Sequence, residues 1–311
     1  MAEALISIIS PIYKAESLVD RLVESIVAEA IKITSDYEII LVEDGSPDNS
    51  WLKISENCSR NKKIKGIKLS RNFGQHFAIT AGIELATGAY IIVMDCDLQD
   101  DPKYIAELYN SALKGYDIVY TEKEQRKHSK WKNITAGLFN RLFNYLVDNK
   151  SWKASSNIGS YSLITRKVAD SFKLYNDYQR HYLMVLRWLG YTNTSIIVEH
   201  KERYEGKSSY NISKLLLHAI NGITSQSDKL LRINVAIGLL LSALSFLGIL
   251  IIIVLYFMHG FLYGWTSTAV LILFSTGMIL TSIGITGLYV GKTFEQTKNR
   301  PKYIIDKFLN S

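Results

Sequence analysis

Two aspartates separated by one residue, Asp95 and Asp97, form the most informative chemical pattern in this chain. They follow an apolar run at 90–94, and more polar residues come directly after them: Gln99, Asp100 and Asp101. Clustered carboxylates at the end of a buried strand are costly unless they are neutralised, and a hard divalent cation with a diphosphate does this well. The pattern therefore predicts a site for a metal ion and a phosphorylated substrate. Alone, so short a motif fits a solvated acidic turn equally well.

Two further polar segments end apolar strands earlier in the chain, at 10–13 and at 43–48. Ligands of open α/β sheets bind outside the carboxyl ends of the strands, so three such ends in succession predict one site. In this site Asp44 would accept hydrogen bonds from a base or a ribose, Gly45 would permit a tight turn, and Ser46 would bond locally. The sequence contains neither the glycine-rich dinucleotide motif nor the P-loop motif.

The elements that must position these residues alternate along the chain. Apolar runs predict strands at 5–10, 37–43, 64–69, 89–94 and 116–121, and helical periodicity predicts helices at 15–30, 49–60, 73–86 and 102–113. This order predicts an α/β fold, with a mostly parallel, Rossmann-like sheet covered by helices on both faces.

A long uncharged stretch follows, because no Asp, Glu, Lys or Arg occurs at 233–291. Its two apolar runs, about 233–257 and 266–290, each exceed the roughly 20 residues that a membrane-spanning helix needs. Lys and Arg flank both outer ends, whereas the connection at 258–265 has none, so both ends are expected in the cytoplasm. An apolar face at helical spacing in 211–232 predicts amphipathic helices in the membrane interface, with packing on the globular domain as the alternative.

These boundaries divide the chain into a cytoplasmic catalytic domain (1–210), interfacial helices (211–232), two membrane spans (233–291) and a basic cytoplasmic tail (292–311). The formal net charge of +7 suits an anionic membrane surface or a phosphorylated substrate. The Lys and Arg residues are scattered and belong to no motif that reads a nucleic-acid groove, so a nucleic-acid partner is not expected.

The chain resembles the family 2 glycosyltransferases with a GT-A fold. The resemblance is strongest to the membrane branch that includes dolichyl-phosphate mannosyltransferase and the bactoprenol glucosyltransferases. Five segments carry it: PIYKAE at 11–16, VEDGSPDNS at 42–50, LSRNFGQHFAITAG at 69–82, ATGAYIIVMDCDLQDDP at 86–102 and RYEGKSSY at 203–210.

This resemblance implies an inverting transfer of a sugar from a nucleotide sugar to polyprenyl (undecaprenyl) phosphate. The reaction would occur at the cytoplasmic face of a bacterial inner membrane and would give a polyprenyl-phosphate monosaccharide for modification of the cell envelope. On resemblance alone, UDP is favoured over GDP and a hexose such as glucose is the expected sugar. Mg²⁺ or Mn²⁺ is the implied cofactor, and the branch also suggests a homo-oligomer such as a tetramer.

The resemblance also implies roles for particular residues. The nucleotide sugar would be bound by Pro11, Tyr13, Glu16, Asp44, Ser46 and Asp95. The metal would be held by Asp95, Asp97 and Gln99. The acceptor phosphate would be bound by Arg126, Arg203, Ser208 and Tyr210, and Asp95, Asp97 and Arg126 would be the catalytic residues.

The chain departs from the family pattern at one site segment. Where many relatives carry an acid, this chain has Ser160, with Asn157 nearby, and Lys14 stands where Asn is common. A general base from this segment is therefore not expected, and an acceptor phosphate that is already anionic needs none. Two other functions stay open. One is a membrane scaffold or flippase partner with a degenerate transferase domain, against which the intact Asp95 and Asp97 argue. The other is a polysaccharide synthase-like transferase, which would need more spans.

Overall fold

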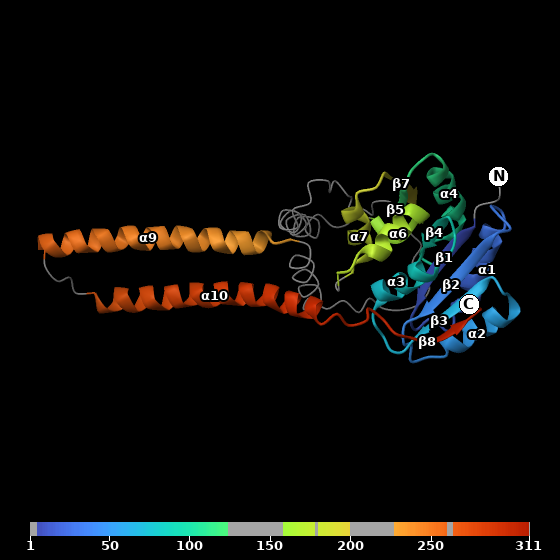
Figure 1. Ribbon diagram of the computed structural model, residues 1–311, viewed down its shortest axis with the longest axis horizontal. Coiled ribbons are helices and arrows are strands. Elements are labelled where there is room, and N and C mark those ends of the chain that lie inside the picture. Colours follow the sequence, from blue (N-terminus) through green and yellow to red (C-terminus); the bar gives the residue numbers. More distant parts are fainter. Residues whose placement is uncertain (1–4, 124–157, 178–179, 200–226, 260–263, 311) are drawn as a thin grey trace. The chain divides into compact units, whose positions relative to one another are not determined.

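The computed structural model describes residues 5–123, 158–177, 180–199, 227–259 and 264–310 (Figure 1). The chain divides into two compact units. The first comprises Met1–Lys127, Ala154–Ser208 and Arg300–Ser311, and the second comprises His128–Lys153 and Ser209–Asn299.

The first unit is built on an eight-stranded sheet in the order β7-β5-β6-β4-β1-β2-β3-β8. The four adjacent strands β4, β1, β2 and β3 run parallel to one another. The strand β6 is antiparallel to its neighbours β4 and β5, and β8 is antiparallel to β3. The bounds are β1 (Ile6–Ile12), β2 (Tyr37–Glu43), β3 (Ile64–Leu69), β4 (Tyr90–Val93), β5 (Ile118–Lys123), β6 (Ile158–Thr165), β7 (Asn193–Val198) and β8 (Ile305–Leu309).

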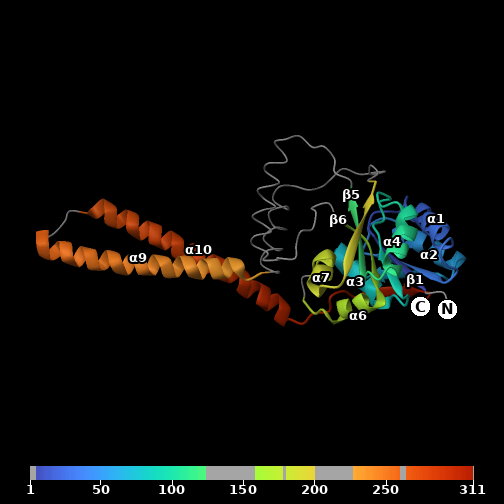
Figure 2. The same cartoon turned by 90° about the horizontal axis from the view of Figure 1, so that it is seen from above.

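Helices cover both faces of this sheet (Figure 2). One core layer lies under α1 (Val19–Ala30), α2 (Ser50–Arg60) and α4 (Ile105–Leu113), and the other lies under α3 (Gln75–Leu85), α6 (Arg166–Leu174) and α7 (Tyr182–Leu189). A short 3-10 helix, η1 (Pro102–Tyr104), precedes α4. The central strand β1 is buried on both faces, with Ile8 in the first layer and Ile9 in the second. Burial on two sides explains why the central strands are mostly apolar, although β1 also buries Ser7 and Ser10.

The predicted α/β fold with a mostly parallel sheet is therefore confirmed. The strands β2 and β3 have the expected bounds, and β5 begins two residues later than expected. The sequence did not indicate β6 and β7, and β6 separates β5 from β4.

The second unit contains two long helices, α9 (Lys229–His259) and α10 (Trp265–Thr297). Both are long and apolar enough to cross a membrane, which confirms the two predicted candidate spans. The Asn234 side-chain amide donates to the Ser282 hydroxyl at 2.9 Å and so links them. The predicted interfacial segment lies outside the described residues up to 226, and its last four residues form the first turn of α9.

The end of the chain, expected as a basic tail, also contains regular structure. The helix α10 continues to Thr297, and β8 then adds to the sheet edge beside β3. The Tyr303 hydroxyl donates to the Glu84 carboxylate on α3 at 2.5 Å. The Asn310 side-chain amide donates to the carbonyls of Cys58 and Ile64, at 2.7 and 2.8 Å. The last residues of the described chain are thus part of the sheet domain.

Candidate functional site

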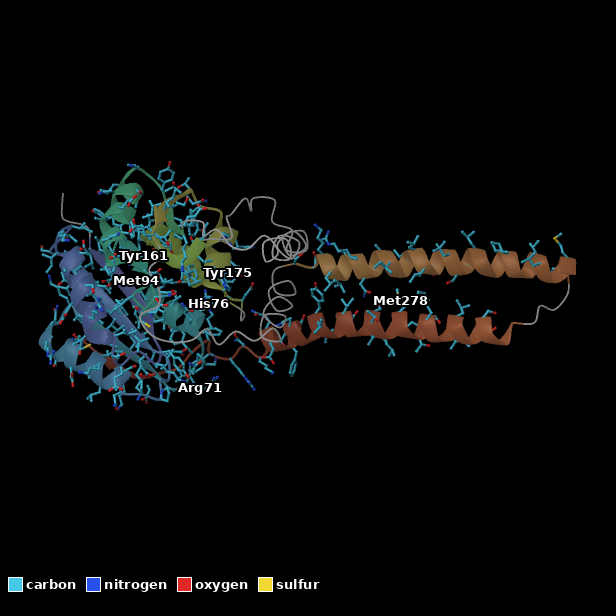
Figure 3. All side chains as sticks on the ribbon, turned by 180° about the vertical axis from the view of Figure 1, so that it is seen from behind. Arg71, His76, Met94, Tyr161, Tyr175 and Met278 are labelled. Carbon is cyan, nitrogen blue, oxygen red and sulfur yellow. The ribbon has the colours of Figure 1, made fainter. Side chains whose placement is uncertain are left out.

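Three polar strand ends meet at one edge of the sheet. The strand β1 lies between β2 and β4 and is parallel to both, with Ile12 opposite Glu43 and Ile9 opposite Val93. Since parallel strands end at the same edge, the residues that follow β1, β2 and β4 are neighbours there. This is the arrangement that the sequence predicts, and Met94, directly after β4, is labelled in Figure 3.

The loop after β4 folds its polar groups around Asp95. The Gln75 side-chain amide, in the first turn of α3, donates to Asp95 Oδ1 at 2.6 Å. The Asp95 backbone N–H donates to Asp100 Oδ2 at 3.3 Å, and the Gln99 N–H donates to Asp97 Oδ1 at 3.2 Å. The loop thereby carries three hydrogen-bonded carboxylates, those of Asp95, Asp97 and Asp100, directly after one strand.

The carboxylates of this loop have too little positive charge near them to offset their burial. Burial raises the pKa of Asp95, although the Ser160 side chain bonds it, and the charge of Asp97 raises this pKa further. Burial also raises the pKa of Asp100 to about 7, and the charge of Asp95 adds to the effect. Lys123, at the end of β5, opposes both shifts only in part. A cation would remove the cost of ionising these carboxylates, so the residues fit a hard metal ion.

The donor set also indicates how such an ion would be held. Across the described segments, no three His, Cys, Asp or Glu side chains form a group that could hold a metal. Mg²⁺ is commonly bound through one or two carboxylates together with substrate phosphates. Asp95 and Asp97 therefore fit an ion that takes its other ligands from a bound diphosphate.

The loop after β2 is fixed by Asp44, which is buried. Its two carboxylate oxygens accept from the backbone N–H groups of Phe73 and Gly74, at 2.7 and 2.9 Å. Burial raises the pKa of Asp44, and these two bonds counteract that rise. The first role of this carboxylate is thus to hold the loop that leads into α3. A carboxylate has about four acceptor positions, so a hydrogen bond to a nucleotide is compatible with both contacts.

The predicted nucleotide residues Glu16 and Ser46 brace two neighbouring loops against each other. The Lys14 N–H donates to the Ser46 hydroxyl at 2.8 Å, and the Asn49 N–H donates to Glu16 Oε2 at 3.1 Å. Pro11 is buried in β1, whereas Tyr13 is 44 % exposed beyond the strand end. Of these residues, Tyr13 presents the most surface for a ligand.

Sequence reasoning missed two residues of the site, Gln75 and Lys123. Gln75 could have been predicted from the sequence, because it lies in the segment 69–82 that follows the end of β3, and site residues are expected after strand ends. Lys123 could not have been predicted, because its place near Asp95 depends on the pairing of β5 with β6, which only the tertiary structure shows. Ser160, which stands at the position of the family's acid, is a hydrogen-bond partner of Asp95.

Several predicted residues cannot be placed in this geometry. Arg126, Asn157, Arg203, Ser208 and Tyr210 lie outside the described residues, and their roles stay predictions.

The chain is similar to known proteins over almost its whole length. The family model described as Glycosyl transferase family 2 matches residues 7–172. The prophage bactoprenol glucosyl transferase homolog of Escherichia coli K12 is 32% identical, over 97% of this chain and 98% of its own. The undecaprenyl-phosphate 4-deoxy-4-formamido-L-arabinose transferase of Aeromonas hydrophila is 28% identical, over 99% of this chain and 94% of its own.

A solved structure shares the fold of the sheet domain. Glucosyl-3-phosphoglycerate synthase from Mycobacterium tuberculosis, in complex with Mn²⁺ and UDP-glucose, matches with a TM-score of 0.51 and 13% identity. The match covers 72% of this chain and 78% of that protein.

Proposed function

Because this chain belongs to glycosyl transferase family 2 and is a glycosyltransferase, we propose that it transfers a sugar from a nucleotide sugar to polyprenyl phosphate. The donor is UDP-linked in preference to GDP-linked, and the sugar is a hexose such as glucose. The acceptor is undecaprenyl phosphate at the cytoplasmic face of a bacterial inner membrane. The observation that carries the proposal is the meeting of the Asp44 and Asp95 loops at one sheet edge. Relatives that span nearly the whole chain are named for undecaprenyl-phosphate and bactoprenol transfer.

The donor site is assigned to the residues after β1, β2 and β4. Pro11, Tyr13, Glu16, Asp44 and Ser46 form the nucleotide side, and Asp95, Asp97 and Gln99 form the metal and diphosphate side. A bound Mg²⁺ or Mn²⁺ would offset the negative charge that develops on the leaving diphosphate. The fold neighbour with Mn²⁺ and UDP-glucose supports a divalent cofactor.

The transfer is a single displacement at the anomeric carbon. A phosphate oxygen of the acceptor forms the new C–O bond from the face opposite the nucleoside diphosphate. The bond to the diphosphate breaks, its electron pair leaves with the nucleoside diphosphate, and the configuration inverts. The acceptor phosphate is ionised near pH 7, so no strong base is required, and the serine at position 160 is consistent with this chemistry. Arg126, Arg203, Ser208 and Tyr210 are assigned to the phosphates, since arginine binds them bidentately.

The membrane places the acceptor within reach of the site. We assign α9 and α10 as spanning helices with both outer ends in the cytoplasm, in agreement with Lys229 and Arg232 in the first turn of α9 and with the Lys and Arg residues that follow position 291. Holding donor and acceptor at one membrane face converts an encounter in solution into a local one, which itself accelerates the reaction. A homo-oligomer, with a tetramer as the first form to test, would appear in the mass of the detergent-purified protein by light scattering.

Nucleoside diphosphate release by the full-length purified protein tests the proposal. The assay contains undecaprenyl phosphate, Mg²⁺ or Mn²⁺ and a panel of UDP- and GDP-sugars. Release should require lipid, cease with chelator and favour one donor. Asp97→Asn should lower turnover by about 100-fold or more, because it removes a carboxylate that binds the metal and diphosphate. Asp117→Asn, outside the site, should not lower it. Release that needs neither lipid nor metal would overturn the proposal.

A further inference from the structure

The ends of α6 and α7 expose two large apolar side chains on one surface. Leu174, the last residue of α6, is 82 % exposed, and Trp188, in the last turn of α7, is 67 % exposed. Tyr175, labelled in Figure 3, follows Leu174 and meets the Trp188 ring edge-on, with 5.3 Å between the ring centroids. We call these residues the Leu174/Trp188 surface.

The exposed side chains of Leu174 and Trp188 lie outside the core that holds the two helices, whereas Tyr175 is buried and belongs to that core. The helix α6 packs through Val168, Ala169 and Phe172, and α7 packs through Tyr182, Val185 and Leu186. The exposed side chains of Leu174 and Trp188 therefore leave apolar surface in contact with water. Such surface is common where a protein meets another apolar phase, and tryptophan in particular is enriched at membrane–water interfaces.

The C-terminal segment ties this surface to the proposed membrane helix through a short piece of chain. The Lys302 ammonium donates to the Tyr175 carbonyl at 3.3 Å and to the Asn176 side-chain oxygen at 3.1 Å. Only five residues lead from Thr297, the end of α10, to Lys302. Fully extended, that piece spans about 18 Å. Covalent connectivity therefore limits how far Lys302, and with it Tyr175, can lie from the end of α10.

The connecting piece is also basic. Arg300 is exposed within it, and Lys302 ends it. Lys and Arg side chains close to an anionic leaflet are attracted to it electrostatically. The exposed apolar pair and the basic connection thus share the chemistry of an interfacial lipid contact.

We infer that the Leu174/Trp188 surface docks on the lipid headgroup layer, with Trp188 at headgroup level and Leu174 toward the acyl chains. The contact orients the catalytic domain against the membrane that carries its acceptor. The inference rests on the proposed function only in taking α10 as a membrane span.

Fluorescence quenching by lipids tests the contact directly. The full-length chain is placed in nanodiscs of phosphatidylcholine and phosphatidylglycerol, with and without bromine on the acyl chains near the headgroup. The emission lost to bromine should be clearly smaller in Trp188→Phe than in the wild type, because that tryptophan no longer contributes. The matched control is Trp51→Phe, on α2, which should lose the same emission to bromine as the wild type. An equal loss in wild type and Trp188→Phe would overturn the inference.

A second experiment places a negative charge on the surface and measures turnover. Leu174→Asp should lower lipid-dependent turnover in nanodiscs by about tenfold, a change of about 1.4 kcal/mol in the barrier. Leu113→Asp, at a residue 57 % exposed on α4, should not lower it. If Leu174→Asp instead changes the oligomeric mass and Trp188 is not quenched, a second copy covers the surface and the lipid contact is wrong. If the wild-type protein shows no lipid-dependent release of nucleoside diphosphate, the proposed function is refuted. The quenching result tests the lipid contact independently of that outcome.

Discussion

Replacement of Gly45 by alanine tests how the site loops are held. Gly45 follows Asp44 with φ +62°, and a Cβ there would lie 2.2 Å from the Asn72 nitrogen and 2.4 Å from the Arg71 carbonyl carbon. These are backbone atoms of the loop that leads into α3, so a side-chain rotation cannot relieve the overlap. Ordinary contact begins at 3.4 Å, so the two loops must separate by about 1.2 Å.

This displacement has a calculable cost. The two Asp44 bonds to that loop are 2.7 and 2.9 Å long, and a shift of this size would lengthen both beyond hydrogen-bond range. Each bond to a charged acceptor contributes about 1.5–3 kcal/mol. A non-glycine residue in the left-handed region adds about 1 kcal/mol. We therefore expect Gly45→Ala to lower the free energy of unfolding by about 4 kcal/mol, or Tm by about 10 °C.

Thermal unfolding in detergent and titration with a nucleoside diphosphate measure the effect. Gly190→Ala is the matched control, because Gly190 has φ +69° but its added Cβ would meet nothing closer than 4.0 Å. The control should lose only about 1 kcal/mol and should bind nucleotide normally. If Gly45→Ala is no less stable than Gly190→Ala and binds nucleotide equally well, the close approach of the two loops does not hold the site.

Three further substitutions each remove hydrogen bonds of one side chain. Glu38→Gln should lower the free energy of unfolding by about 2 kcal/mol at pH 7, because it removes a charged hydrogen-bond acceptor. Burial favours protonation of Glu38, but bonds from lysine, serine and threonine hold its pKa below 4.5, so its stabilisation is complete above that pH. The gap between wild type and variant in pH-dependent unfolding should therefore narrow as pH falls through the lowered pKa. Gln75→Ala removes the 2.6 Å bond to Asp95 and should weaken Mn²⁺ binding several-fold by calorimetry; an unchanged affinity contradicts its positioning role. Tyr303→Phe loses the bond to Glu84, about 1 kcal/mol, and should speed hydrogen exchange in β8; unchanged exchange would show that β8 is held otherwise.

Much of the fold could be predicted because its signals are local. Apolar runs marked β1 to β5, helical periodicity marked α1 to α4, and missing charges marked α9 and α10. Each of these signals depends only on neighbouring residues and on burial. The same reasoning located the Asp44 and Asp95 loops, since parallel strands end at one edge.

The tertiary structure alone decided how distant segments complete the domain. The strand β6 enters between β4 and β5 in the antiparallel sense and brings Ser160 to Asp95. The strand β8, which follows the two apolar helices in the chain, pairs with β3. Both pairings are made by backbone N–H and C=O groups, which every residue other than proline carries, so no residue type marks them in advance.

Within the candidate site, too, local features could be predicted from the sequence, whereas contacts between distant segments could not. The sequence by itself determined which carboxylates stand at strand ends and that two segments are apolar enough to cross a membrane. The contact of Gln75 with Asp95, and the placing of Lys302 beside Tyr175, were decided only when distant segments came together. Side chains at strand ends follow from local periodicity, whereas their partners depend on the packing of the whole sheet and its helices.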